Sequence, residues 1–530
     1  MASSAKYILA LFIVVVVTAE AGLSQKYFPD DPIQAFPPPL PVDHAVPRDI
    51  EPVSDFLKNS LNRNPRPPVP ASAVNTLGNV PDSDWFTNRH ERRRMSIEEL
   101  QRGAGTDNAP IPPFVVIGGK LDGISVGFRM KDSVGRKYFV KADPVSHPEM
   151  MTATEVIVSK FFYALGYNTP ENYIFCAKRS DFRVSSKAEL NSGRPMTWDH
   201  FEDILRKVPE RSDGSYRFVA SLAVEGESIG PFRYEGTRGD DPNDTIPHEN
   251  RRDLRGLFVM ASWLNHTDVK ATNTLDTIIQ NEFPFVRHYL IDFGSALGSD
   301  GDMAKDARFG HEFMLPTLSE AVTTILKFGL FPEDWERAKF PHLDAAGHFQ
   351  SKVFDPQEWK TDYPNPAFLS RLPDDEFWGA KLVMAFNDED IRAIVETGQY
   401  SDYRVTEYMT QTLINRREKI GKAYFSKLLA LDHFEVRNGE LVFEDLAAKY
   451  GFQPPAQYGI GWFELDNTTQ QRTPLLDGKE NRLPQRALTS APGTYFSARI
   501  ESIQNAKLCV WVDIRKTDTG FEVVGIERSC

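Results

Sequence analysis

The spacing of apolar and polar positions predicts a three-stranded meander in the first third of the folded chain. Phe114 to Ile117, Ile124 to Met130 and Lys137 to Val140 carry aromatic and β-branched residues, and glycine-containing turns separate these runs. From about Met151 to Leu165 apolar residues recur every four positions, which predicts a helix. This order of elements indicates a small β-rich lobe with one long helix.

A second set of patterns predicts a mainly helical region. Tyr216 to Val224 is typical of an apolar strand, which we expect to link two lobes. Helical spacing then recurs in four later stretches, Leu254 to Leu264, Leu318 to Phe328, Asp388 to Glu396 and Val405 to Leu431. The pattern changes again near residue 432.

The last hundred residues are predicted to form a small β-rich domain spanning 432–530. Phe434 to Phe443 places Asn438-Gly439 between alternating apolar residues, a strong hairpin signal. Further strands are expected at Thr494 to Ile500, Leu508 to Ile514 and Phe521 to Ile526. Cys509 and Cys530 both lie in this domain and could pair, which would leave Cys176 over.

The N-terminus has the features of a secretory signal peptide over residues 1–21. Lys6 precedes the apolar run Tyr7 to Val17, and Ala19-Glu20-Ala21 resembles a cleavage site. Eleven apolar residues are too few to span a bilayer, so we expect no membrane span after cleavage. An uncleaved anchor is the alternative. Either reading predicts an exported protein: periplasmic, cell-envelope or extracellular.

Residues 22–83 are predicted to be a proline-rich flexible linker. Twelve prolines fall between Phe28 and Pro70, and such density excludes long helices and central strands. Ser54 to Leu61 is the one stretch expected to form a helical turn. A role as a proline-rich ligand for a partner domain is the alternative to a plain spacer.

Composition narrows the class of protein. A chain of 530 residues with 41% hydrophobic content has room for two or three cores. The formal charge of −13 argues against a nucleic-acid partner, which favours basic surfaces. The segment Gly236 to Arg255 concentrates both signs of charge. It is either a solvated, salt-bridged surface or an insertion that recognises a substrate.

Two short motifs carry the strongest chemical signal. His266-Thr267-Asp268-Val269-Lys270-Ala271-Thr272-Asn273 is followed, nineteen positions later, by Asp292-Phe293-Gly294. A carboxylate such as Asp268 can orient a hydroxyl and accept its proton, and Lys270 can reach a transferring phosphate. Asn273 and Asp292 supply the hard oxygen ligands that Mg²⁺ takes. Asp, Asn and His are also common in turns, so each motif alone is a weak signal.

These motifs resemble the catalytic and metal loops of the protein-kinase-like superfamily, in its atypical, exported bacterial type. The resemblance covers roughly residues 114–431. It implies an α+β fold with a small β-rich N-terminal lobe and a mainly helical C-terminal lobe, over 84–431. In such a fold Lys141 on the third strand contacts nucleotide phosphates and Glu155 on the helix pairs with it. A first-turn glutamate can also simply stabilise its helix.

The resemblance also implies a glycine loop over the phosphates, here Gly118, Gly119 and Gly123, although their spacing departs from the usual one. Thr267 stands where regulated kinases have arginine, which implies control without phosphorylation of the following loop. An Ala-Pro-Glu element is absent from the sequence, so peptide recognition of the ordinary kind is not expected.

Two functions from different classes follow. The first is a phosphotransferase that uses ATP and Mg²⁺ (or Mn²⁺) to modify a hydroxyl of a protein or a small molecule such as a sugar. The second is a catalytically inactive kinase-like binding or scaffold protein of the cell envelope. Retention of the polar motif residues favours the enzyme, whereas export disfavours it because ATP is scarce outside most cytoplasms.

Overall fold

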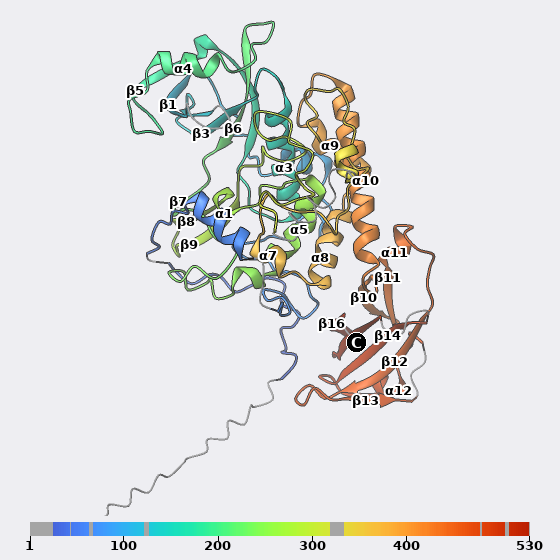
Figure 1. Ribbon diagram of the computed structural model, residues 1–530. Coiled ribbons are helices and arrows are strands. Elements are labelled where there is room, and N and C mark those ends of the chain that lie inside the picture. Colours follow the sequence, from blue (N-terminus) through green and yellow to red (C-terminus); the bar gives the residue numbers. More distant parts are fainter. Residues whose placement is uncertain are drawn as a thin grey trace, which may run out of the picture.

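The computed structural model describes residues 25–42, 44–62, 67–120, 127–317, 333–476, 480–503 and 508–528. The fold is mixed α+β, with a sheet unit at one end, a helical body in the middle and a C-terminal β unit at the other end (Figure 1). The predicted signal peptide and the predicted helix from Leu318 to Phe328 lie outside the described residues. Within them, no helix is both long enough and apolar enough to cross a membrane.

The sheet unit is built on a six-stranded sheet in the order β4-β6-β3-β2-β1-β5. Its inner strands confirm the predicted meander, and β5 adds to the edge parallel to β1. The strands are β1 (Phe114–Lys120), β2 (Gly127–Lys131), β3 (Lys137–Ala142), β4 (Asn172–Lys178), β5 (Phe182–Leu190) and β6 (Ser215–Leu222). Helix α4 (Trp198–Leu205) buries Phe201 against the apolar face of this sheet.

The helical body shares one large apolar core. Its helices are α2 (Ile97–Arg102), α3 (Met150–Leu165), α5 (Arg252–Leu264), α7 (Pro366–Leu369), α8 (Pro373–Met384), α9 (Asp388–Glu396) and α10 (Tyr403–Phe425). Every residue of α5 is buried, which requires neighbours on all sides. Helices α5 and α8 approach closely at Gly256 and Gly379, since a Cβ on Gly379 would lie 2.8 Å from the Gly256 carbonyl oxygen.

A small sheet joins the sheet unit to the helical body. After β6 the chain enters β7 (Glu227–Ser228), which pairs with β8 (Thr274–Ile279), and β8 pairs with β9 (Phe285–Leu290). The end of β6 thus links the two parts of the molecule, as the sequence predicts. The hairpin of β8 and β9 separates the two chemical motifs along the chain.

The C-terminal β unit confirms the predicted change of character near residue 432. It contains the hairpin β10 (Leu431–Arg437) and β11 (Glu440–Asp445), and a five-stranded antiparallel sheet. That sheet comprises β12 (Tyr458–Leu465), β13 (Arg472–Leu475), β14 (Tyr495–Ser502), β15 (Cys509–Lys516) and β16 (Phe521–Glu527), with short helices α11 (Leu446–Lys449) and α12 (Gln485–Leu488). Cys509 is disulfide-bonded and Cys176 is free; Cys530 lies outside the described residues.

The prediction of a flexible linker is wrong for the described part of residues 25–83, which we call the strap. It crosses the helical body and reaches the C-terminal β unit (Figure 1). Val42 N–H donates to Pro284 O at 2.7 Å, and Ser72 N–H donates to Asn250 O at 2.7 Å. The predicted helical turn is longer than expected, forming α1 (Pro52–Leu61). Proline removes donors from the strap, but its remaining backbone groups are bonded by other segments.

The charged segment 236–255 supplies many of those bonds, so it is not simply a solvated surface; its recognition of a substrate stays a prediction. Arg238 donates to Val46 O at 2.6 Å, and Arg255 donates to Val69 O at 2.8 Å. Both arginines are fully buried rather than solvated. The Asn243 amide exchanges two hydrogen bonds with the backbone of Leu40. The charges therefore hold the strap in place.

Candidate functional site

The β8–β9 hairpin brings the two sequence motifs to one place. Asn273 ends the first motif just before β8, and Asp292 opens the second just after β9. Thr274 pairs with Leu290 across the hairpin, and Ile291 N–H donates to Asn273 O at 3.1 Å. Since paired strands fix the register of their ends, the two loops lie side by side.

Lys141 lies between two carboxylates that come from other elements. Its Nζ is 2.8 Å from Glu155 Oε2 on α3 and 2.7 Å from Asp292 Oδ1 after β9. The other Glu155 oxygen accepts from Phe293 N–H at 3.1 Å. Glu155 lies beyond the first turn of α3, so its expected interaction with the helix dipole is not its role. It connects the lysine of the sheet unit to the backbone of the second motif.

The electrostatics of this cluster keep its charges in place. Burial opposes the charge on Lys141, but Asp292 and Glu155 outweigh burial and raise its pKa. Lys141 in turn lowers the pKa of Asp292. The Asp292 side chain is 51% exposed, so solvent weakens its share of the interaction. An anionic oxygen that is both charged and open to solvent is available to a cation.

The first motif forms a second polar cluster. Lys270 Nζ is 2.7 Å from Asp268 Oδ1, and Asn273 Nδ2 donates at 2.9 Å to both the backbone oxygen and Oδ2 of Asp268. Burial raises the pKa of Asp268, and Lys270 opposes that shift. The amide nitrogen of Asn273 is engaged by Asp268, so its amide oxygen is the atom it offers to a metal ion.

The backbone and core around the motifs support this arrangement. Asp292 has a φ of 63°, a left-handed conformation that non-glycine residues adopt at a cost, often at functional sites. Phe293 stacks on Phe162 of α3 with ring centroids 5.4 Å apart. His266 packs beside both rings, and burial lowers its pKa to about 4. His266 is thus neutral near pH 7, in keeping with a packing role.

The glycines assigned to a phosphate loop contact protein side chains. Gly118 and Gly119 lie within β1, where added Cβ atoms would come within 2.4 Å of Arg129 and 2.8 Å of Met196. Both contacts are with the ends of flexible side chains, so packing contributes to the choice of glycine but does not by itself require it. Gly123 lies outside the described residues. Phosphate contact by these glycines stays a prediction.

Two buried charges near Asp268 were missed from the sequence. Lys305 Nζ donates to Ser295 Oγ at 2.9 Å and lies 3.7 Å from Asp362. Asp362 is tied to the first motif, because its N–H donates to Thr267 O at 2.9 Å. Lys305 and Asp362 act on the pKa of Asp268 in opposite directions. No motif marks either residue, since they lie 37 and 94 positions beyond Asp268.

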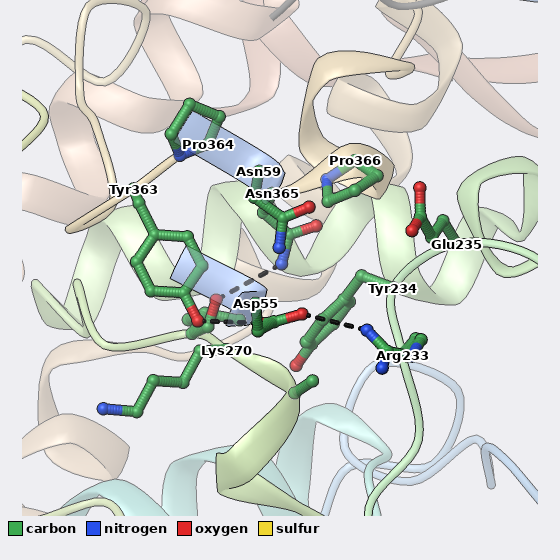
Figure 2. Close-up of a pocket in the computed structure, with 12 residues that line it drawn as sticks. Asp55, Asn59, Arg233, Tyr234, Glu235, Lys270, Tyr363, Pro364, Asn365 and Pro366 are labelled. Atoms are coloured by element: carbon green, nitrogen blue, oxygen red, sulfur yellow. Dashed lines mark hydrogen bonds and ion pairs between the residues drawn. The ribbon is translucent and has the colours of Figure 1, made fainter. Parts of the chain in front are cut away.

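A small pocket opens beside Lys270 (Figure 2). One wall comes from α1 of the strap, where buried Asp55 accepts from Tyr363 Oη at 2.9 Å and from Arg233 Nη1 at 3.2 Å. Asn59 and Asn365 add amide groups to the lining. A segment that the sequence assigned to a linker thus forms part of the surroundings of the first motif.

Comparisons with protein-family models, with curated proteins and with solved structures find no match to this chain. The site is therefore interpreted from its own geometry. It combines a lysine paired with two carboxylates, a second carboxylate paired with a lysine, and an amide that offers an oxygen. This set can bind a phosphate-bound divalent cation and can accept a proton from a hydroxyl.

Proposed function

We propose that this protein is a phosphotransferase that moves a phosphoryl group from ATP, with Mg²⁺ or Mn²⁺, to a hydroxyl of a protein or a small molecule such as a sugar. We further propose that the sheet unit and helical body form a two-lobed kinase-like fold. The observation that carries the proposal is the contact of Lys141 with both Glu155 and Asp292. It joins the sheet unit, α3 and the second motif in one ion-paired group.

Some residues of the site would bind the nucleotide and metal, and others would act in phosphoryl transfer. Lys141, positioned by Glu155, would contact the nucleotide phosphates. Asp292 and the amide oxygen of Asn273 would hold the divalent ion, which neutralises phosphate charge. Asp268 would orient the acceptor hydroxyl and accept its proton, a role that its raised pKa favours. Lys270, 2.7 Å from Asp268, would interact with the phosphoryl group as it transfers.

The pocket beside Lys270 has room for about one water molecule, so it does not hold an acceptor as it stands. We propose only that the acceptor hydroxyl approaches Asp268 from this polar side, which amides, a tyrosine and charged groups line. The charged segment 236–255 is a poorer choice, because its buried arginines already bind the strap.

A catalytically inactive binding protein is the second candidate, favoured by the predicted export. Both candidates allow nucleotide binding, and only the first requires transfer.

Thermal-shift titration of the mature protein with ATP and Mg²⁺ or Mn²⁺ tests the proposal, because a ligand that binds only the native state raises the melting temperature. We expect a metal-dependent rise of several degrees in the wild type and none in Asp292→Ala. Labelled ATP should also transfer phosphate to an acceptor, or to water more slowly. Equal shifts in the two proteins would argue against the metal role, and binding without any transfer would favour the second candidate.

A further inference from the structure

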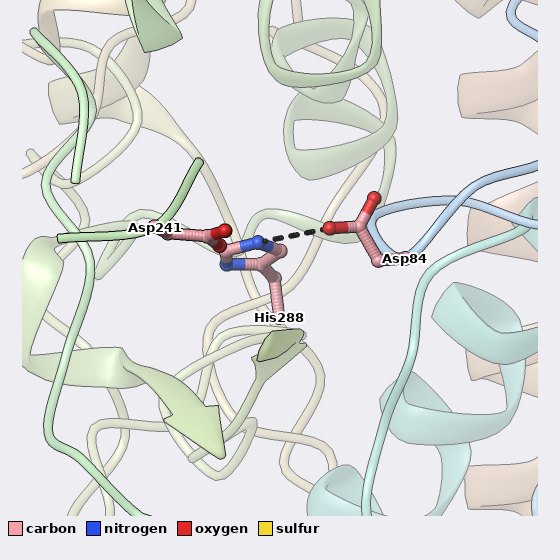
Figure 3. A group of neighbouring side chains, drawn as sticks. All are labelled: Asp84, Asp241 and His288. Atoms are coloured by element: carbon pink, nitrogen blue, oxygen red, sulfur yellow. Dashed lines mark ion pairs between the residues drawn. The ribbon is translucent and has the colours of Figure 1, made fainter. Parts of the chain in front are cut away.

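A second group of metal-ligating side chains lies outside the candidate site (Figure 3). Asp84 directly follows the strap, Asp241 belongs to the charged segment 236–255, and His288 lies on β9. Each offers one donor atom, and these atoms all lie within 4.8 Å of one another. Three segments that are distant in the sequence therefore direct polar atoms to one point.

Two of the three donors are buried and lack hydrogen-bond partners among the described residues. Asp241 is 4% exposed; its Oδ1 accepts from Asn243 N–H at 2.9 Å, while its Oδ2 has no partner. His288 is 3% exposed, and its Nε2 makes no hydrogen bond. Leaving such atoms unsatisfied costs about 1–3 kcal/mol each, so a missing ligand is a physical explanation for them.

The other ring nitrogen of His288 is held as a metal-binding histidine requires. Its Nδ1 lies 2.7 Å from Asp276 Oδ1, a carboxylate on the neighbouring strand β8. A bond of this kind fixes the tautomer that leaves Nε2 free to coordinate and makes the ring a stronger ligand. Trp85 stacks on the ring with centroids 3.5 Å apart, which limits its rotation.

We propose that Asp84, Asp241 and His288 bind a divalent transition-metal ion, with Zn²⁺ the best fit to the donors. One imidazole and two carboxylates match the nitrogen and oxygen ligands that Zn²⁺ takes, whereas Mg²⁺ and Ca²⁺ prefer oxygen alone. Donors around Zn²⁺ stand roughly 3.4 Å apart when bonds are about 2.1 Å long. The present spacing of up to 4.8 Å would therefore have to shorten on binding through side-chain rotation.

The surroundings favour a cation and give it a route inward. Arg238 Nη1 lies 3.2 Å from Asp276 and offsets that carboxylate, so Asp84 and Asp241 remain as net negative charge. Asp84 also lines an open groove between the proline-rich part of the strap and β9. An ion can reach the group from solvent through this groove, and a water molecule can complete its coordination.

A metal-free ion pair is the competing explanation. Burial disfavours charge on His288, but Asp276 and Asp84 outweigh it and raise its pKa to about 9. A protonated ring would then pair with Asp84, whose Oδ2 is 3.5 Å from Nε2. This arrangement leaves the buried Asp241 oxygen unexplained. Substitution of Asp241 therefore distinguishes the two explanations. A metal ion would need the Asp241 carboxylate as a ligand, whereas the ion pair between His288 and Asp84 would not.

The test is a Zn²⁺ titration of the mature chain by calorimetry after EDTA dialysis, with Asp292→Ala as the background so that the candidate nucleotide site cannot contribute. We expect one saturable site per chain and a Zn²⁺-dependent rise in melting temperature. Adding Asp241→Asn should weaken binding by about 10- to 100-fold or more and remove the rise. Asp203→Asn, the same change at a half-exposed position on α4, should leave Zn²⁺ affinity unchanged.

Asp84→Asn gives a second test at a less buried position, in case Asp241→Asn does not fold. It should weaken Zn²⁺ binding to a similar degree. Absence of saturable Zn²⁺ binding in the background protein overturns the proposal. So does equal affinity in the background protein and in either folded ligand variant.

Discussion

The candidate site and the arginines that bind the strap, Arg238 and Arg255, differ in how their charged side chains are exposed and bonded. At the site, Lys141 pairs with Glu155 and Asp292, and Asp292 is half exposed. Around the strap, the fully buried Arg238 and Arg255, which we call the clamp, pair with buried carboxylates and also donate to backbone carbonyls of the strap. An ion pair open to solvent can exchange one partner for a ligand. A buried arginine bonded to backbone cannot do so without exposing unsatisfied groups.

This difference separates residues that act on a ligand from residues that hold the fold. Substitutions at the site should reduce activity while the protein stays folded. Substitutions in the clamp should reduce the free energy of unfolding while the folded molecules stay active. Four predictions test this division, from the largest expected effect to the smallest.

Asp268→Asn should lower the rate of phosphoryl transfer by about 10²- to 10⁴-fold, the usual range for a lost general base. Binding of ATP and metal should persist, because Lys141 and Asp292 are unchanged. Single-turnover transfer measured beside thermal-shift titration checks both parts. Undiminished transfer would remove Asp268 from the base role.

Lys141→Met and Glu155→Gln should each lower kcat/KM for ATP. The double variant should lose little more than the worse single variant, because Glu155 acts through the position of Lys141. Steady-state kinetics of the four proteins forms the double-mutant cycle. Fully additive losses would show that the two residues act independently, despite the 2.8 Å contact between them.

Arg255→Gln should lower the free energy of unfolding by about 3 kcal/mol, since it leaves carbonyls of Glu249 and Val69 without their donor. Transfer per folded molecule should be unchanged. Urea denaturation measures the first quantity. Arg93→Gln is the matched control: Arg93 pairs with Glu99 at the surface and is 71% exposed, so its loss should cost less than 1 kcal/mol. Equal losses of unfolding free energy in Arg255→Gln and Arg93→Gln would contradict the distinction between buried and exposed arginines.

Asp432 belongs to a buried group in which a carboxylate pairs directly with two cations. It lies 2.5 Å from Lys381 and 3.2 Å from Arg528, where the helical body meets the C-terminal β unit. Burial alone would raise its pKa, but these two cations lower it to about 2. An unfolded aspartate titrates near 3.9, so this contribution is complete above pH 4 and is lost as the pH falls towards 2.

Asp432→Asn should therefore lower stability by roughly 2 kcal/mol at pH 7, and the difference from wild type should shrink between pH 4 and pH 2. Denaturant unfolding across this range is the measurement. A difference that stays constant with pH would mean that the lost packing, not the lost charge, accounts for the effect.

Local patterns predicted the elements well where neighbours in sequence are neighbours in space. The meander, α3 and the hairpin around Asn438-Gly439 belong to this group. The edge strand β5 and helix α4 escaped prediction, because β5 is placed by pairing with β1 and α4 by packing on the same sheet. The same holds for the site, where the motifs marked Asp268, Lys270, Asn273 and Asp292 but nothing marked Lys305 and Asp362.

The strap was mispredicted for a specific physical reason. Proline content reports which regular structures a segment cannot form, but not whether side chains elsewhere will bind its backbone. The partners of Val46 and Val69 lie more than 180 positions further along the chain. Asp84, Asp241 and His288 are also widely separated, and each alone is an ordinary polar residue. Only the folded backbone brings these groups together.

The attachment of the strap to the C-terminal β unit joins segments that are very distant along the chain. Lys26 pairs with Asp513 and Glu527, which follow it by 487 and 501 positions. Contacts across such a separation close a long loop and form slowly. Helix α1 of the same strap carries Asp55 to Arg233 and Tyr363 beside the first motif. One segment therefore contacts both the C-terminal β unit and the surroundings of the site, so a change that loosens its early residues can reach both regions.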